Sequence, residues 1–189
     1  MATNTNGRNV QRPWTVLAAA ATAGHHGFEL SNGIGLVWQP ELGLTGASAL
    51  WGTQIPVWMA LAARGDRRWD KLLAVWSGAN VGGAFVHFLL WPSRRNRAGL
   101  PVLTEAEGLD ASRLPAYNAL LYVWGAASAL SIVRDIRPRD RRWALVGLAA
   151  LPLLRRSAQH HFSWLTEQAE SNPAWWNRGV RGRETPISS

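Results

Sequence analysis

Residues 72–91 read LLAVWSGANVGGAFVHFLLW, a stretch without a single Asp, Glu, Lys or Arg. An α-helix rises about 1.5 Å per residue, so a stretch of this length matches the roughly 30 Å hydrocarbon core of a bilayer. Residues 44–63 (LTGASALWGTQIPVWMALAA) and 116–133 (AYNALLYVWGAASALSIV) are equally free of charge. Three such segments predict an all-α fold, a polytopic bundle of helices integral to a membrane.

Two weaker segments flank these three. Residues 14–38 begin apolar, turn polar at HHGFELSN and end apolar, and residues 143–164 join the apolar WALVGLAALPLL to SAQHHFSW. Counting both gives about five transmembrane helices, or four if the last segment does not cross. We therefore expect a single transmembrane domain over residues 13–176, with spans near 14–38, 44–63, 72–91, 116–133 and 143–164, between disordered tails at 1–12 and 177–189.

Most of the charge of the chain lies in the connections between these segments. The formal net charge is +8, and Lys71 is the only lysine among 20 basic residues. Nucleic-acid-binding surfaces are not normally divided by long apolar segments, so we expect the lipid bilayer and not a nucleic acid as partner. The absence of cysteine excludes disulfide scaffolds and cysteine-based zinc sites. The basic groups of the connections are Arg64, Arg67 and Arg68; Arg94, Arg95 and Arg97; and Arg134, Arg137, Arg139, Arg141 and Arg142.

Their distribution predicts the orientation of the chain. Basic connections stay on the cytoplasmic side, which favours a cytoplasmic N-terminus in a multi-pass protein of the inner (plasma) membrane. The connection that contains Arg94, Arg95 and Arg97 opposes this orientation. High use of Arg, Ala, Gly and Trp indicates a bacterial source. An alternative for the N-terminus is that WTVLAAAA, followed by residues 21–23 (ATA), is a cleaved secretory signal.

Ionisable side chains inside the apolar segments are the candidate functional residues. Each costs about 2.5–3.5 kcal/mol at membrane depth, so its presence needs a reason. On a helix His25, Glu29 and Asn32 share one face. With five spans, three separate helices bring all the histidines and Glu29 into the outer half of the bilayer. The predicted catalytic residues are Glu29, His25, His26, His87, His160 and His161.

This set suits acid–base chemistry on a hydrophobic substrate. A protonated carboxylic acid in an apolar pocket can give its proton to an alkene or polyene, and a histidine can remove a proton elsewhere. That is isomerase or cyclase chemistry on a lipid-like or isoprenoid molecule, and it needs no cofactor. Aromatic rings stabilise cationic character in such a substrate. The predicted substrate-binding residues are Asn32, Trp51, Trp58, Trp76, Asn80, Tyr122 and Trp124.

Two other functions use the same polar residues. Imidazole and carboxylate groups are ligands for iron, zinc or copper, and two histidines can hold a haem, so the chain is alternatively a membrane electron-transfer subunit. Its ligands would be among His25, His26, His87, His160 and His161. A third possibility is a non-enzymatic transporter or accessory protein, acting as a homo-oligomer or with a partner subunit. The sequence contains no P-loop, G-x-S-x-G or H-E-x-x-H motif, so it leaves open whether the chain is an enzyme.

Overall fold

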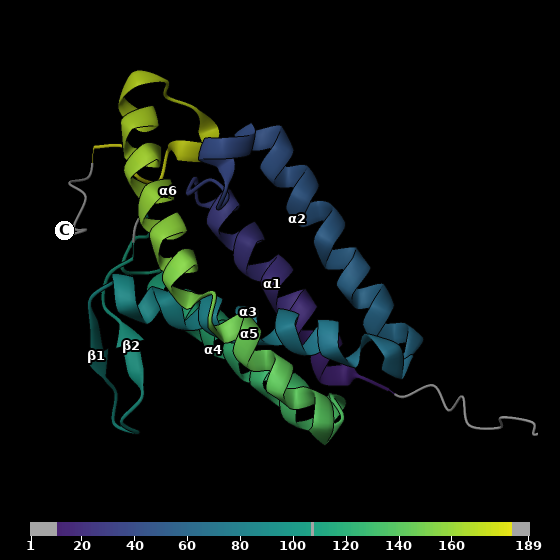
Figure 1. The fold of residues 1–189 in the computed structure, drawn as a ribbon. Coiled ribbons are helices and arrows are strands. Elements are labelled where there is room, and N and C mark those ends of the chain that lie inside the picture. The colour runs from purple at the N-terminus through teal and green to yellow at the C-terminus, as the bar shows by residue number, and fades with distance from the viewer. Residues whose placement is uncertain (1–10, 107, 183–189) are drawn as a thin grey trace, which may run out of the picture.

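The computed structural model describes residues 11–106 and 108–182, and this part of the chain is almost entirely helical (Figure 1). Residues 1–10 and 183–189 of the expected tails lie outside the described residues. The helices are α1 (Pro13–Ser31), α2 (Gln39–Arg64), α3 (Asp70–Leu90), α4 (Leu114–Leu130), α5 (Ala144–Leu148) and α6 (Leu151–Ser171). Short helical turns are η1 (Arg67–Trp69), η2 (Ser131–Asp135), η3 (Pro138–Trp143) and η4 (Trp175–Asn177), and β1 (Ser93–Arg95) pairs with β2 (Pro101–Leu103) in one antiparallel hairpin.

Helix α1 packs against two of the other long helices. It lies beside α2 (Figure 1) and also packs against α4, while α3 packs against α4 and α5. The α1 face in these contacts is built from small residues, and Ala18 and Ala19 are completely buried. They belong to one cluster with Ile55 of α2, Trp76 of α3 and Ala127 of α4, so four helices meet around this face.

Helices α3 and α5 touch backbone to backbone through two glycines. A Cβ atom on Gly147 would lie 2.0 Å from the carbonyl oxygen of Val75, and one on Gly78 would lie 2.1 Å from that of Ala144. No side chain fits at either position, so the absence of Cβ sets the distance between these helices.

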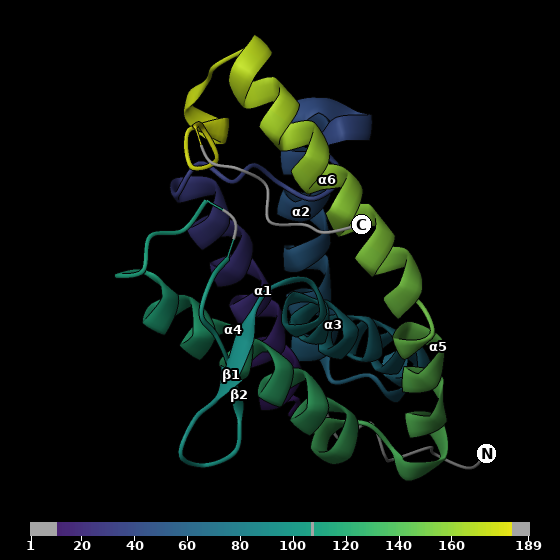
Figure 2. The same cartoon turned by 90° about the vertical axis from the view of Figure 1, so that its left-hand side faces the viewer.

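The first and last expected spans are not continuous helices. Helix α1 ends at Ser31, and Gly33 and Gly35 then adopt positive φ, which begins a loop that leads to α2. The segment 143–164 is divided between α5 and α6, with Pro152 in the first turn of α6, where a proline without N–H is tolerated. In Figure 2 α3 is seen nearly along its axis whereas α6 runs along the picture, so these two helices cross steeply.

Two helical stretches of the described residues are long and apolar enough, by length and composition, to cross a membrane. They are Arg67–Leu90 and Leu114–Asp135, which include α3 and α4. Large apolar side chains are also exposed on α2, α3, α4 and α6 and on the short η2 and α5. The most exposed of them include Val57, Leu72, Phe85, Leu89, Val123, Val133, Leu145, Val146 and Leu153.

The segments next to α1 and α6 are packed where the sequence suggests disordered tails. Arg12 is buried because its guanidinium group pairs with the carboxylate of Asp70, at the start of α3. Beyond α6, Asn177 and Val180 are buried as well, and the Gly179 N–H donates to the Gly33 carbonyl oxygen at 3.0 Å. The helical domain therefore extends past the limits expected for it on both sides.

Candidate functional site

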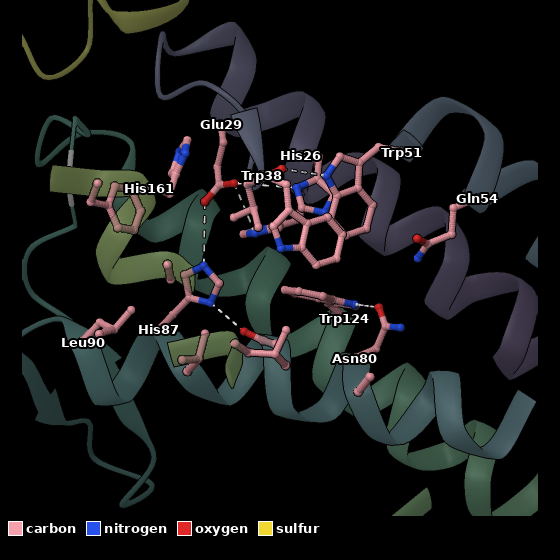
Figure 3. Close-up of a pocket in the computed structure, with 18 of the residues that line it drawn as sticks. His26, Glu29, Trp38, Trp51, Gln54, Asn80, His87, Leu90, Trp124 and His161 are labelled. Atoms are coloured by element: carbon pink, nitrogen blue, oxygen red, sulfur yellow. Dashed lines mark hydrogen bonds and ion pairs between the residues drawn. The ribbon is translucent and has the colours of Figure 1, made fainter. Parts of the chain in front are cut away.

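The ends of three helices bring the ionisable residues together around one carboxylate. Glu29 lies in the last turn of α1, His87 in the last turn of α3 and Tyr117 in the first turn of α4. His25 and His26 stand one turn before Glu29 on α1. We call Glu29, His25, His26, His87 and Tyr117 the Glu29 centre; Figure 3 shows Glu29, His26 and His87 of this group.

The carboxylate of Glu29 is enclosed by four polar side chains. The Tyr117 hydroxyl donates a hydrogen bond to Glu29 Oε1 at 2.6 Å. His25 Nε2 and His26 Nδ1 lie 3.4 and 3.8 Å from Oε2, and His87 Nε2 lies 3.7 Å from Oε1. Glu29 is only 5% exposed and all its neighbours in the centre are buried. Only Tyr117 contacts the carboxylate at a normal hydrogen-bond distance.

A contact with the backbone fixes which ring nitrogen of His87 carries the proton. His87 Nδ1 lies 2.8 Å from the carbonyl oxygen of Gly83. Because a carbonyl can only accept, Nδ1 carries the proton, and in the neutral ring the lone pair of Nε2 faces Glu29. Among the described residues, His25 Nδ1 and both nitrogens of His26 have no hydrogen-bond partner. Buried nitrogens without partners are uncommon in folded proteins and often mark a ligand, water or ion site.

A hydrogen-bonded tryptophan supports the centre from one side. The Trp124 indole stacks on the His25 ring, with centroids 4.6 Å apart and planes at 25°. Its Nε1–H donates to Asn80 Oδ1 at 2.6 Å (Figure 3), and the Thr22 hydroxyl donates to the same oxygen at 2.7 Å. Asn80 in turn donates to the carbonyl oxygen of Trp76 at 2.8 Å. Asn80 therefore holds α1, α3 and α4 together and fixes the position of Trp124.

A cavity of about 140 Å³ lies beside the centre, between α1, α2, α3 and α6. An apolar cavity of about this size, roughly 150 Å³, holds a molecule such as benzene. The cavity is therefore large enough for a small apolar group, or for one end of a longer chain. The aromatic and polar residues that line it include Trp38, Trp51, Gln54, Trp76, Asn80, Trp124 and His161 in addition to His25, His26, Glu29 and His87.

The structure separates the two histidines of α6. His161 is buried and lines the cavity, with Nε2 3.1 Å from the Ile34 carbonyl oxygen. The side chain of His160 is 57% exposed, and its Nε2 lies 3.7 Å from Glu41 Oε1, away from the Glu29 centre. Of the six residues predicted to be catalytic, His160 is the one that does not line the cavity.

Three of the predicted substrate-binding residues also lie outside the cavity lining. Asn32 donates to the Phe28 carbonyl oxygen at 2.6 Å at the end of α1, and the Tyr122 hydroxyl donates to Pro101 of the hairpin. Trp58 stacks on the outer side of the site against Trp76, with centroids 5.1 Å apart. These contacts give all three residues structural roles.

Sequence reasoning missed four residues that build the site, namely Tyr117, Trp38, Gln54 and Thr22. A tyrosine within an uncharged segment is a usable signal, because its hydroxyl needs a partner when buried. Tyr117 finds that partner in Glu29. No protein-family model, curated protein or solved structure matches the chain, so the chemistry of the site is argued from its geometry.

Proposed function

We propose that the chain is a small integral membrane enzyme that acts on a hydrophobic, lipid-like or isoprenoid substrate by acid–base chemistry of the isomerase or cyclase type. The observation that carries this proposal is a buried carboxylate, surrounded by imidazoles, that borders a cavity walled by tryptophans. Such a combination of titratable groups and apolar walls suits proton transfer to and from carbon.

The membrane setting is supported by the surface of the helices. Two helices are apolar and long enough to cross, and Phe85, Val123 and Val133 on them are about half exposed. Apolar side chains exposed on neighbouring helices would be unfavourable in water but are suited to lipid. We place the protein in the inner membrane of a bacterium, with the N-terminus in the cytoplasm and several membrane passes.

The proposed reaction adds one proton and removes another, so it needs no oxidant or reductant. An acid of the Glu29 centre gives a proton to one carbon of a substrate double bond, and the cation that results lies near the faces of Trp51 and Trp124. A neutral imidazole then takes a proton from a neighbouring carbon, which moves the double bond. In a cyclisation, a second double bond of the substrate first attacks the cation to close the ring, and the proton is lost afterwards. His26 is well placed as this base, since its ring lines the cavity and its centroid lies 3.8 Å from that of the Trp51 ring, with the planes tilted by 40°.

The test uses deuterium as a record of proton transfer to carbon. Full-length protein in detergent is incubated in D₂O with a total lipid extract of bacterial membranes, and mass spectrometry follows carbon-bound deuterium. We expect the wild type to label one lipid class, and Glu29→Gln to lower the rate by at least about 100-fold, since general acid–base groups contribute roughly 10²–10⁴-fold. The control His160→Gln changes an exposed imidazole outside the centre and retains the wild-type rate. A wild type that labels no lipid, or an active Glu29→Gln protein, contradicts the proposal.

A further inference from the structure

Two buried carboxylates in this protein have different counter-charges. Asp70 pairs with three guanidinium groups, from Arg12, Arg67 and Arg137. Glu29 is equally buried, yet its only ion-pair partners among the described residues are histidines. A buried carboxylate is balanced by a paired cation or a coordinated metal, or else takes up a proton. The centre thus lacks a permanent positive charge that would balance Glu29.

From this difference and from the distances between the three side chains, we infer that His25, Glu29 and His87 together bind one divalent transition-metal ion. This inference rests on the proposed function in one respect: it takes the cavity as the place where the substrate binds and from which the substrate reaches the metal. One ligand atom from each of the three residues can be chosen so that all lie within 4.8 Å of one another, and all three residues are buried.

The distances fit ligands that share an ion better than they fit hydrogen bonds. His25 Nε2 and His87 Nε2 lie 3.4 and 3.7 Å from the Glu29 oxygens. Nitrogen–oxygen hydrogen bonds are about 2.7–3.2 Å long. Ligands held tetrahedrally at about 2.0–2.2 Å from a metal ion are separated by roughly 3.4 Å. A small movement of the side chains is enough to complete such a site.

The surroundings already orient two of the three ligands. Histidines that bind metal commonly donate their second N–H to a carbonyl, which fixes the tautomer, and His87 does so to Gly83 at 2.8 Å. Carboxylate ligands are hydrogen-bonded in a similar way, and the Tyr117 hydroxyl donates to Glu29 at 2.6 Å. His26 adds an independent indication: it is 6% exposed, its Nδ1 lies 3.8 Å from Glu29, and neither ring nitrogen has a partner among the described residues.

Two histidines and one carboxylate leave coordination positions open. This ligand set is typical of non-haem iron(II) sites and also suits zinc. All three ligands line the cavity, so a molecule in the cavity can reach the ion. A divalent ion makes bound water a stronger acid. An ion held by His25, Glu29 and His87 would supply an acidic water beside the cavity, while His26, which is outside this ligand set, would stay free to accept a proton.

Cobalt(II) binding tests the site without any substrate. Full-length protein in detergent is treated with a chelator and titrated with Co²⁺, and the visible absorption and bound metal are measured. We expect one cobalt per wild-type chain, and at least about a 10-fold loss of affinity in His25→Ala, Glu29→Gln and His87→Ala. The control His160→Ala alters the exposed His160–Glu41 pair and keeps wild-type affinity. His87→Cys should show sulfur-to-cobalt charge-transfer absorption, which a merely structural role at residue 87 does not produce.

The outcomes separate this inference from the proposed function. The metal site is overturned if the wild type binds no cobalt. It is also overturned if the His160→Ala variant is the only one that loses cobalt. Deuterium labelling by the same chelator-treated protein then shows that the acid–base function stands without metal. Stoichiometric cobalt that is lost in the three ligand variants supports the metal site, even if no lipid is labelled and the proposed function fails.

Discussion

At the scale of single residues, Asp70 is a completely buried charge paired with three arginines. Its Oδ2 accepts from Arg137 Nε at 2.7 Å, and its Oδ1 pairs with Arg12, whose side chain is completely buried. Removing one partner of a buried ion pair leaves an uncompensated charge and costs about 3–5 kcal/mol. We therefore expect Asp70→Asn to lower the free energy of unfolding by about that amount, measured by thermal denaturation in detergent. Glu41→Gln is the matched control, because that half-exposed carboxylate contributes less than about 1 kcal/mol, and equal effects of the two changes would contradict the argument.

The same scale shows how far a site can be inferred from sequence. The pairing of His25 with Glu29 follows from their spacing of four residues on one helix, and their distance is 3.4 Å. The choice between His160 and His161 cannot be made in this way. Neighbouring residues point about 100° apart, and the rotation of α6 is set by its packing and not by its own sequence. Tyr117 was missed because it carries no charge at neutral pH, so a search for ionised groups passes over it.

At the scale of helices, the contact between α3 and α5 is the most sensitive. A methyl group at Gly147 meets backbone atoms of Val75 and Ala79 at 2.0 and 2.5 Å, and backbone cannot move aside as a side chain can. We expect Gly147→Ala to destabilise the protein by at least about 1–3 kcal/mol, the usual cost of overpacking. Gly52→Ala in α2 is the control: nothing lies within 4 Å of its added methyl, and alanine favours a helix by about 0.5–1 kcal/mol. The melting temperatures of the two variants test this prediction. If the Gly147→Ala protein is as stable as the Gly52→Ala protein, the backbone contact at Gly147 does not limit the packing of α3 and α5.

Helix limits were predictable where charges bound the segment. The windows 72–91 and 116–133 nearly coincide with α3 and with α4 plus the turn that follows it, because basic residues stand at both ends of each window. The end of α5 was harder, since the chain stays apolar across it, and the end of α1 lies in the polar stretch HHGFELSN, after which the segment becomes apolar again. Pro152 and the glycines after α1 were available signals, but such residues also occur inside helices that cross membranes. A prediction from hydropathy alone therefore treats α5 and α6 as one membrane-spanning segment.

At the scale of the whole molecule, the polar interior is divided between two ends of α3. At its start, the Asp70 carboxylate pairs with Arg12, Arg67 and Arg137 and connects the beginnings of α1 and α3 to η3, although Arg12 Nε has no hydrogen-bond partner among the described residues. At its end, the Glu29 centre keeps nitrogens without partners beside a cavity. The first arrangement stabilises the fold, whereas the second is costly for stability and therefore suited to binding and chemistry. The arginines of η1 and η3 gather at the first end, which lies in the cytoplasm in the proposed orientation.

This orientation can be tested because the chain contains no cysteine, so a single introduced thiol reports its own side of the membrane. Arg97 lies in the exposed connection of the β-hairpin between α3 and α4, and Arg139, with 74% of its side chain exposed, lies in η3 after α4. If α4 crosses the membrane, these two positions lie on opposite sides. We expect a membrane-impermeant maleimide to label Arg97→Cys in intact spheroplasts, and Arg139→Cys only after permeabilisation. The reverse pattern inverts the orientation, and equal labelling of both in intact spheroplasts shows that α4 does not cross, which contradicts the proposed membrane arrangement.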